Sequence, residues 1–275
     1  MPRVLKLVLA YDGSAYVGWQ RQTRGQSIQG LIEEALSRID GVPVLVAGAG
    51  RTDAGVHALG QVASARVSTT LGQSRLKRAL NAILPSDVRV VSLEDASEQF
   101  HARFSASVKT YEYWIWQGDV LPPLLRASCW HIPRPLDVSS MDTASRLLEG
   151  RHDFAAFQGA GGRVKTSVRT IRSARVGMGA AWFGRVASPF DSATEDDHGH
   201  PVVVRVEADG FLRHMVRAVV GTLVEVGDHR RDVNSIAALL DRADRREAGP
   251  TAPPHGLVLV RVQYLQAVAP DAGSR

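Results

Sequence analysis

The sequence contains a single cysteine, Cys129, among its 275 residues. One cysteine excludes an intramolecular disulfide and any zinc site built from several cysteines, and it predicts a reducing compartment. We expect Cys129 to be a buried apolar residue rather than a nucleophile. Lysine is also scarce, because only Lys6, Lys77, Lys109 and Lys165 occur among the 33 basic residues. The others are arginines, whose planar guanidinium suits phosphates and base edges, although a GC-rich genome gives the same bias.

Long apolar runs are missing as well. No stretch reaches the ~20 residues that a membrane-spanning helix needs, and the apolar start is interrupted by Lys6 without a small-residue cleavage site. We therefore expect a soluble cytoplasmic protein. The composition, 44% hydrophobic and 22% charged, is typical of a globular chain that buries a large core. The formal net charge of +5 suits a polyanionic partner such as nucleic acid without requiring one.

A loop rich in glycine carries the most informative pattern. Residues 47–67 read AGAGRTDAGVHALGQVASARV, and glycines surround Arg51 and Asp53. A dinucleotide-binding GxGxxG motif needs glycine at position 53, and a phosphate-binding GxxxxGK[ST] motif needs lysine at position 56, so neither motif is complete. A carboxylate in this loop can act as a nucleophile or a base, and the nearby guanidinium favours its charged form. The alternative is a structural ion pair that braces the turn.

Apolar periodicity predicts an α+β chain whose halves repeat one order of elements, strand, helix, strand, strand, helix, strand. This is the order of a ferredoxin-like split βαβ unit. The predicted elements of the first half are strand 4–10, a helix from Ser27 to Gly41, strands 42–47 and 61–67, a helix from Ser74 to Pro85, and strand 88–93. Those of the second half are strand 107–116, helix 140–149 ended by Gly150, strands 170–176 and 202–208, a buried helix 211–226, a short helix 234–245, and strand 257–265.

These elements predict two βαββαβ halves that share a mixed, mainly antiparallel sheet with a central cleft, where sites are usually built. The N-terminal half covers residues 1–105 and carries the glycine-rich loop, the C-terminal half covers residues 106–266, and residues 267–275 form a flexible tail. The connection at 177–201 includes an acidic and histidine-containing cluster around Glu195. We interpret that cluster as a solvated loop rather than a metal site.

Two further segments carry candidate residues. In KTYEYWIW, residues 109–116, the tyrosines share one strand face and the tryptophans the other. Exposed aromatic side chains stack on unpaired bases, and Tyr111 is the best candidate, whereas core packing is the better interpretation of the other three. In GFLRHMVRAVVG, Arg213 and Arg217 lie one turn apart on an apolar helix. A buried arginine needs a partner, which would be Asp53 or an RNA phosphate unless the side chain simply reaches the surface.

The remaining chemistry-bearing residues give no cofactor signature. Histidines such as His57, His101, His131 and His214 lack metal-ligand spacing, so we interpret them as packing or hydrogen-bonding residues. The sequence predicts no cofactor and no metal site.

Several motifs together resemble one known family. They are YDGSAYVGWQRQ, GRTDAGVHALGQV, LNAILP, FHARFSASVKTYEYWIW, GRHDFAAF, GFLRHMVR and AGPTAPPHGLVLVRVQY, and they follow the family's order and spacing over nearly the full chain. In these motifs the chain resembles the tRNA pseudouridine synthase A family. The resemblance implies an isomerase that converts uridine to pseudouridine at positions 38, 39 and 40 in the anticodon stem-loop of tRNA. It also implies a homodimer with two α/β halves on one continuous sheet.

The resemblance assigns roles to five residues of this sequence. Asp53 is implied to be the catalytic aspartate, with Arg51 as its neighbour in the loop and Arg217 as its ion-pair partner. Tyr111 is implied to stack on the target base, and Leu257 to add an apolar contact. The reaction is an internal rearrangement and needs no redox agent. The sequence leaves open whether the carboxylate attacks C1′ or removes the 2′ proton, and a noncatalytic RNA-binding protein of the same fold is the alternative.

Overall fold

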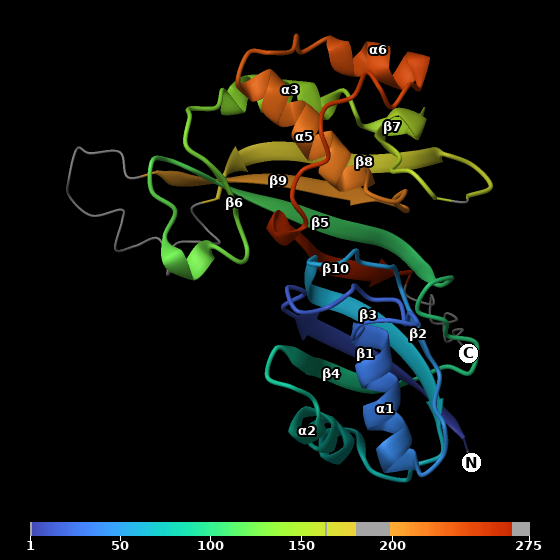
Figure 1. Ribbon diagram of the computed structural model, residues 1–275. Helices are drawn as coiled ribbons and strands as arrows, with labels where there is room; N and C mark the ends of the chain where they lie inside the picture. Colours follow the sequence, from blue (N-terminus) through green and yellow to red (C-terminus); the bar gives the residue numbers. More distant parts are fainter. Residues whose placement is uncertain (1, 163, 180–198, 266–275) are drawn as a thin grey trace, which may run out of the picture.

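The order of elements repeats along the chain as predicted. The structure is a computed structural model that describes residues 2–162, 164–179 and 199–265 (Figure 1). The first half contains β1 (Arg3–Tyr11), α1 (Ile28–Asp40), β2 (Val46–Gly48), β3 (His57–Val67), α2 (Gln73–Ile83) and β4 (Val88–Ala96). The predicted tail at 267–275 and the cluster around Glu195 lie outside the described residues.

The second half has the same order with several short additions. Its main elements are β5 (Ala106–Gln117), α3 (Val138–Arg146), β8 (Val168–Met178), β9 (His200–Ala208), α5 (Met215–Gly227), α6 (Ser235–Arg242) and β10 (Leu257–Tyr264). Its short elements are η1 (Pro123–Leu125), β6 (Trp130–Ile132), β7 (Gly150–Asp153), η2 (Ala155–Phe157) and η3 (Pro254–Gly256). No strand was predicted at β6 or β7, which are too short to show alternation.

One sheet of ten strands runs through both halves in the order β4-β1-β3-β10-β5-β9-β8-β7, with β2 paired to β3 and β6 to β5. Each half has four predicted strands, and in both halves the first of them lies between the third and the fourth. In the first half β1 lies between β3 and β4, and in the second half β5 lies between β9 and β10. The β3–β10 and β5–β6 pairs are parallel and the other pairs are antiparallel. The predicted α+β class, with a mixed, mainly antiparallel sheet, is therefore confirmed. The division at residue 105 stays a prediction.

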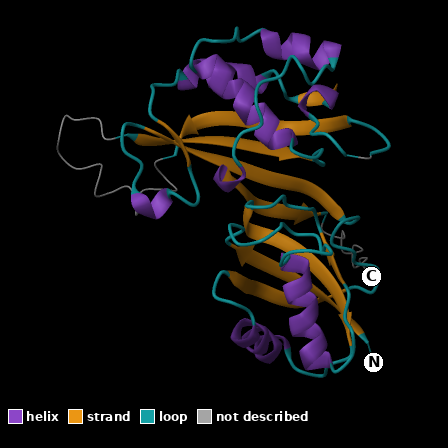
Figure 2. Cartoon of the chain, in the orientation of Figure 1, coloured by secondary structure: helices purple, strands orange, loops and turns teal. Residues whose placement is uncertain are grey.

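The two halves meet where β10 pairs with β3, at Val258 opposite His57 and Leu259 opposite Ala58. Helices α1 and α2 cover the first half of the sheet, whereas α3, α5 and α6 lie over the second half (Figure 2). Most buried apolar side chains form one cluster between these helices and the sheet. A smaller cluster contains Trp114 and Trp116, while Tyr111 and Tyr113 belong to the main cluster, so the predicted division of the aromatic strand into two faces is confirmed.

The ends of α1 follow the predicted signals. Ser27 is the N-cap, and its side-chain oxygen accepts a hydrogen bond from the backbone N–H of Gly30. Gly41 ends the helix with φ of 77°, a left-handed conformation that glycine adopts without a Cβ penalty.

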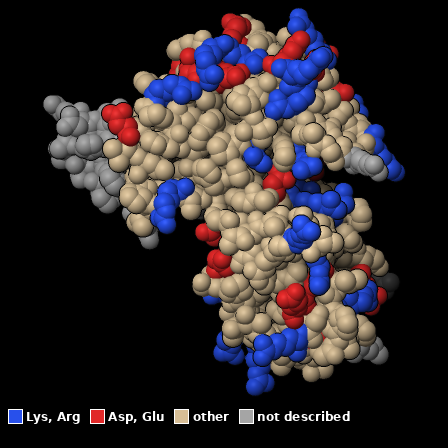
Figure 3. All heavy atoms as spheres, viewed as in Figure 1, with Lys and Arg blue, Asp and Glu red and all other residues tan. Residues whose placement is uncertain are grey.

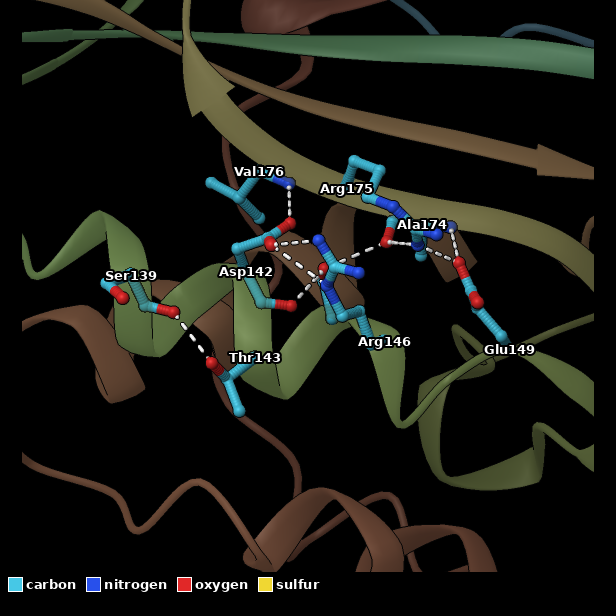
Figure 4. A network of polar contacts seen from close by, with 9 residues as sticks. Ser139, Asp142, Thr143, Arg146, Glu149, Ala174, Arg175 and Val176 are labelled. Carbon is cyan, nitrogen blue, oxygen red and sulfur yellow. Dashed lines mark hydrogen bonds and ion pairs between the residues drawn. The ribbon is translucent and has the colours of Figure 1, made fainter.

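The predicted bounds of the helix after β5 were wrong at both ends. Asp137 caps α3 by accepting from the N–H of Ser140, so the helix starts before residue 140. Gly150 does not terminate the helix but begins β7, because the chain there pairs with Ile171 of β8. Figure 4 shows how α3 and the residues after it bind to β8: the carboxylate of Asp142 in α3 accepts from the N–H of Val176, and Glu149, three residues after the helix ends, pairs with Arg175.

Other predicted bounds differ as well, including the start of β3 at His57 rather than at residue 61 and the end of α6 at Arg242 rather than at residue 245, and two more lie near the site. The buried helix begins at Met215 rather than at residue 211, because His214 has φ of 60° and cannot continue a right-handed helix backwards. The strand predicted at 42–47 is β2, which covers only Val46–Gly48, because pairing with β3 starts at Val46 opposite Ala65. The site lies close to both of these differences.

Candidate active site

The loop between β2 and β3 is held in place by buried hydrogen bonds. The Thr52 hydroxyl lies 2.9 Å from the Tyr11 hydroxyl, and the Thr52 carbonyl accepts a 3.0 Å bond from the N–H of Trp19. Gln61 donates from its side-chain amide to the Gly50 carbonyl at 2.9 Å. Thr52 is buried, whereas Asp53 beside it is 31% exposed in its side chain. The loop therefore fixes its backbone and presents the Asp53 carboxylate.

The YDGSAYVGW segment packs directly against this loop. A Cβ on Gly13 would lie 2.0 Å from the carbonyl oxygen of Val56, so only glycine fits there. Gly18 has φ of 104°, and a Cβ at that position would lie 2.5 Å from the carbonyl oxygen of Thr52. These two glycines let the segment support the backbone on both sides of Asp53.

Helix α5 brings a cation to the Asp53 carboxylate. Arg217 Nη1 lies 3.6 Å from Asp53 Oδ2, a distance of an ion pair rather than a hydrogen bond. The guanidinium is only 13% exposed, and its Nε donates a 2.7 Å bond to the carbonyl of Ala252. Among the partners weighed for Arg217 from the sequence, Asp53 is the one that the structure places beside it.

His214 also lies at Asp53, and sequence reasoning missed it. Its Nε2 is 3.5 Å from Asp53 Oδ2. Burial lowers the pKa of His214 below its ordinary value of 6.5; the charges of Arg217 and Arg213 lower it further, while that of Asp53 opposes them. The imidazole is therefore largely neutral at pH 7. The available signal was spacing, since residues 214 and 217 share one face when both are placed on a helix.

Arg51 does not brace the turn through Asp53. The arginine is exposed, and within residues 2–162, 164–179 and 199–265 no ion pair joins it to Asp53. The structural alternative of an Arg51–Asp53 pair is thus not supported. Arg51 is thus an exposed residue of the loop, two positions before Asp53.

Tyr111 and Leu257 lie on the neighbouring strands β5 and β10. Tyr111 is 6% exposed, and its ring contacts that of Phe211 edge to face with centroids 5.0 Å apart. Burial is the main cause that raises the pKa of Tyr111, and the nearby charge of Asp53 adds to it. Leu257 is 6% exposed and lies opposite Tyr113 in the strand pairing. Of the predicted site residues, Arg217 lies 3.6 Å from Asp53 and Tyr111 is close enough for the Asp53 charge to act on it, while Leu257 precedes Val258, which pairs with His57 on β3.

The surroundings of the loop are basic. The side chain of Lys109 lies near Gly50, since a Cβ built there would be 3.8 Å from Lys109 Nζ. Burial lowers the pKa of Lys109, and the positive charges of Arg103 and Arg169 lower it further. In Figure 3, Lys and Arg atoms surround an acidic group where the molecule narrows between its upper and lower parts. Such a surface favours a polyanion at the carboxylate.

Two other features bear on possible ligands. Cys129 is buried, as predicted, and burial raises the pKa of its thiol to about 12. No group of three or more metal-ligating side chains occurs in the part of the chain that the structure describes.

Within that same part, no helix is long and apolar enough to cross a membrane.

Comparison with known proteins gives a consistent result. The family described as tRNA pseudouridine synthase matches residues 7–105 and 144–265. A tRNA pseudouridine synthase A of Myxococcus xanthus is 44% identical over 264 residues, covering 96% of this chain and 92% of its own length. The tRNA pseudouridine synthase A 2 of Clostridium perfringens is 39% identical and covers 95% of this chain and 100% of its own length. The tRNA pseudouridine synthase A of Rhodospirillum rubrum is 41% identical and covers 94% of this chain and 87% of its own length. A solved structure of an unknown protein from Galdieria sulphuraria covers 84% of this chain and 94% of its own at 12% identity, with a TM-score of 0.24.

Proposed function

The chain belongs to the tRNA pseudouridine synthase family, and we propose that it converts uridine to pseudouridine at positions 38, 39 and 40 of the tRNA anticodon stem-loop. The observation that carries this proposal is the Asp53 carboxylate, presented by a rigid loop of one half and paired with Arg217 of the other at 3.6 Å. The RTDAGVHA segment that holds Asp53 is also part of the matched family region. The substrate positions come from the resemblance.

The rearrangement needs few groups because it is internally balanced. The C1′–N1 bond breaks with its electron pair leaving on uracil, the base turns, and C5 forms a new bond to C1′. C5 then loses its proton and N1 gains one, so no oxidant, reductant or second substrate enters. Asp53 either adds to C1′ and is later displaced, or removes the 2′ proton to give a glycal and returns that proton to C2′ when C5 bonds to C1′. In both routes an ionised carboxylate starts the reaction.

The other site residues position the base and the carboxylate. We assign Arg217 to pair with the Asp53 carboxylate and orient it, and Arg51 to contact the RNA beside the target nucleotide. The nucleotide must leave its stack, which costs a few kcal/mol. Tyr111 offsets part of that cost by stacking on the uracil, and Leu257 supplies an apolar contact.

The test is direct and uses the C5 proton. We expect the protein to form pseudouridine at positions 38 to 40 of unmodified tRNA, and to release tritium from substrate labelled at uridine C5. Asp53→Asn should abolish both signals, while Asp241→Asn on the exposed face of α6 should retain them. Full activity of Asp53→Asn would overturn the assigned mechanism. Pseudouridine formed only elsewhere in the tRNA would overturn the substrate positions.

We further propose that the protein works in the cytoplasm as a homodimer whose subunits contact one tRNA together, as the resemblance implies. Light scattering after size-exclusion chromatography should give twice the mass of one chain. A monomer that is fully active at nanomolar concentration would contradict this proposal. The division into halves at residues 1–105 and 106–266 belongs to the same proposal.

A further inference from the structure

Among the exposed large apolar side chains of the described residues, Phe104 is the one aromatic. It is 77% exposed, whereas every tryptophan and tyrosine of those residues is buried or half-buried. An exposed ring on a polar surface costs free energy in water, so its surroundings show whether it has a use.

The Phe104 ring is part of a stacked arrangement. The ring of His101 lies 4.4 Å from it, centroid to centroid, with the planes 33° apart. The guanidinium of Arg103 lies 5.7 Å from the centre of the Phe104 ring, within the range of a cation–π contact. One aromatic side chain, one imidazole and one guanidinium therefore share a small patch of surface.

The loop that carries this patch is braced rather than loose. The N–H groups of Arg103 and Phe104 both point to Nδ1 of His101, at 3.1 and 3.4 Å. Within the same turn, the N–H of Ser105 donates to the His101 carbonyl at 2.9 Å. The turn therefore presents the exposed ring in a defined position, which reduces the entropy lost when a ligand binds.

The turn is also anchored to the sheet on both sides of the halves' junction. The N–H of Ala102 donates to the Ser64 hydroxyl on β3 at 3.1 Å. The Tyr264 hydroxyl on β10 donates to the Ala102 carbonyl at 2.8 Å. The patch is thus fixed relative to the strands that carry the active site.

Electrostatics connect the patch to the catalytic loop. Lys109 lies against Gly50 of that loop, and the Arg103 charge is close enough to act on Lys109. Lys109 therefore lies near both the loop and the Arg103 charge, and two cations at this separation suit a phosphate backbone that passes from one to the other. A chain of nucleotides on this path would bring bases near Phe104.

We propose that Phe104, with His101 and Arg103, is a platform on which an unpaired base of the RNA stacks, at a position separate from the target uridine at Asp53. Phe104 supplies the face for the base, and Arg103 contacts an adjacent phosphate. Aromatic platforms of this kind bind single-stranded RNA with little sequence preference. This platform rests on the proposed function only in that its ligand is RNA.

The platform is tested by binding, independently of turnover. We expect Phe104→Ala to weaken binding of an anticodon stem-loop by about 5- to 140-fold, the range that corresponds to loss of one base stack. Phe104→Tyr should bind within about 2-fold of wild type because the ring is kept. Leu124→Ala, at a side chain that is 84% exposed on η1, is the matched control and should bind like wild type.

Quenching of a fluorescent base reports stacking on Phe104 directly, which a purely structural role of Phe104 would not produce. In stem-loops with 2-aminopurine at successive loop positions, one position should be quenched by wild type and Phe104→Tyr but not by Phe104→Ala. Equal affinity and equal quenching for wild type and Phe104→Ala would overturn the platform. So would a shift of the monomer–dimer equilibrium in Phe104→Ala without loss of RNA affinity, since Phe104 would then be a subunit contact.

The same variants separate this inference from the proposed function. At saturating RNA, Phe104→Ala should form pseudouridine at a rate close to that of wild type, because the loss is in binding. If wild type binds the stem-loop through Phe104 but forms no pseudouridine, the proposed function fails and the platform stands. If wild type forms pseudouridine and Phe104→Ala binds normally, the platform fails alone.

Discussion

The substitution Gly18→Ala tests whether the YDGSAYVGW segment sets the position of the catalytic loop. Gly18 has φ of 104°, a conformation that costs a non-glycine residue roughly 1 to 2 kcal/mol. The added Cβ would lie 2.5 Å from the Thr52 carbonyl oxygen and 3.0 Å from the carbonyl carbon of Asp53. Real Cβ atoms do not approach closer than 3.0 Å, and both neighbours are backbone atoms, so the loop itself must retreat.

The expected magnitude follows from that displacement. Misplacing a catalytic group by 1 Å can cost about 10²-fold in rate, so a shift of roughly half that distance should lower kcat by about 10- to 100-fold. Strain of roughly 1 to 2 kcal/mol corresponds to a fall in Tm of about 2 to 8 °C for a chain of this size. Single-turnover pseudouridine formation and thermal unfolding measure the two effects separately.

Gly177→Ala is the matched control, because a Cβ at Gly177 meets nothing within 4 Å and its φ is not in the left-handed region. It should leave kcat and Tm near the wild-type values. RNA affinity should stay within a few fold in both variants, since the three atoms nearest the Cβ added at Gly18 all belong to the loop backbone. Wild-type kcat in Gly18→Ala would refute the argument that this glycine positions Asp53.

Three further outcomes follow from the structure. Arg217→Met should lower kcat/KM by about 10- to 10³-fold. This range is the attraction between two unit charges 3.6 Å apart, taken at effective dielectric constants between 80 and 20. Arg217→Lys should lower kcat/KM less because it keeps the charge. Burial lowers the folded-state pKa of His255 below 6.5, so the unfolded state binds more protons, and stability should fall as pH drops from 6.5 through the folded pKa. In urea titrations at several pH values, His255→Gln should lose less stability over this pH range than wild type. An unchanged pH dependence in the variant would contradict this. The buried thiol of Cys129, with its pKa raised to about 12, should react with iodoacetamide at pH 8 only after unfolding, and rapid alkylation of the native protein would show that the site opens.

Much of the fold could be predicted from periodicity, because local signals determine most elements. Ser27 and Gly41 mark both ends of α1, and the alternation in 109–116 divides the aromatic side chains correctly between two faces. The junction of the halves could not be predicted in the same way. It depends on two residue pairs, including Val258 with His57, that are about 200 positions apart in the sequence, and no local pattern encodes their register.

Site residues could be predicted from the sequence where a charged residue interrupts a glycine-rich or apolar segment. Asp53 interrupts a glycine motif and Arg217 interrupts an apolar helix, so each is visible in the sequence. His214 gave a weaker signal, its spacing of three residues from Arg217. Its left-handed backbone, with φ of 60°, occurs at a residue that is not glycine, and this conformation moved the start of α5 to Met215.

The proline-rich segment before β10 determines the geometry of both partners in the ion pair. Arg217 donates to the Ala252 carbonyl and, through its own carbonyl, accepts from the Ala252 N–H. A Cβ at Gly55, two residues after Asp53, would lie 3.1 Å from the ring of Pro254. The Arg217 guanidinium and the loop of the Asp53 carboxylate therefore both contact the segment from Ala252 to Pro254, although they come from different halves.

The turn formed by this segment follows α6 and is held against α5. Its far end is fixed as well, because the Tyr113 hydroxyl donates to the Pro253 carbonyl at 2.8 Å and β10 then pairs with β3. A Cβ at Gly221 of α5 would lie 1.8 Å from the carbonyl oxygen of Pro250, so the helix and the turn are in direct backbone contact. The turn therefore links α5, which carries Arg217, to the loop that carries Asp53, across the junction of the halves.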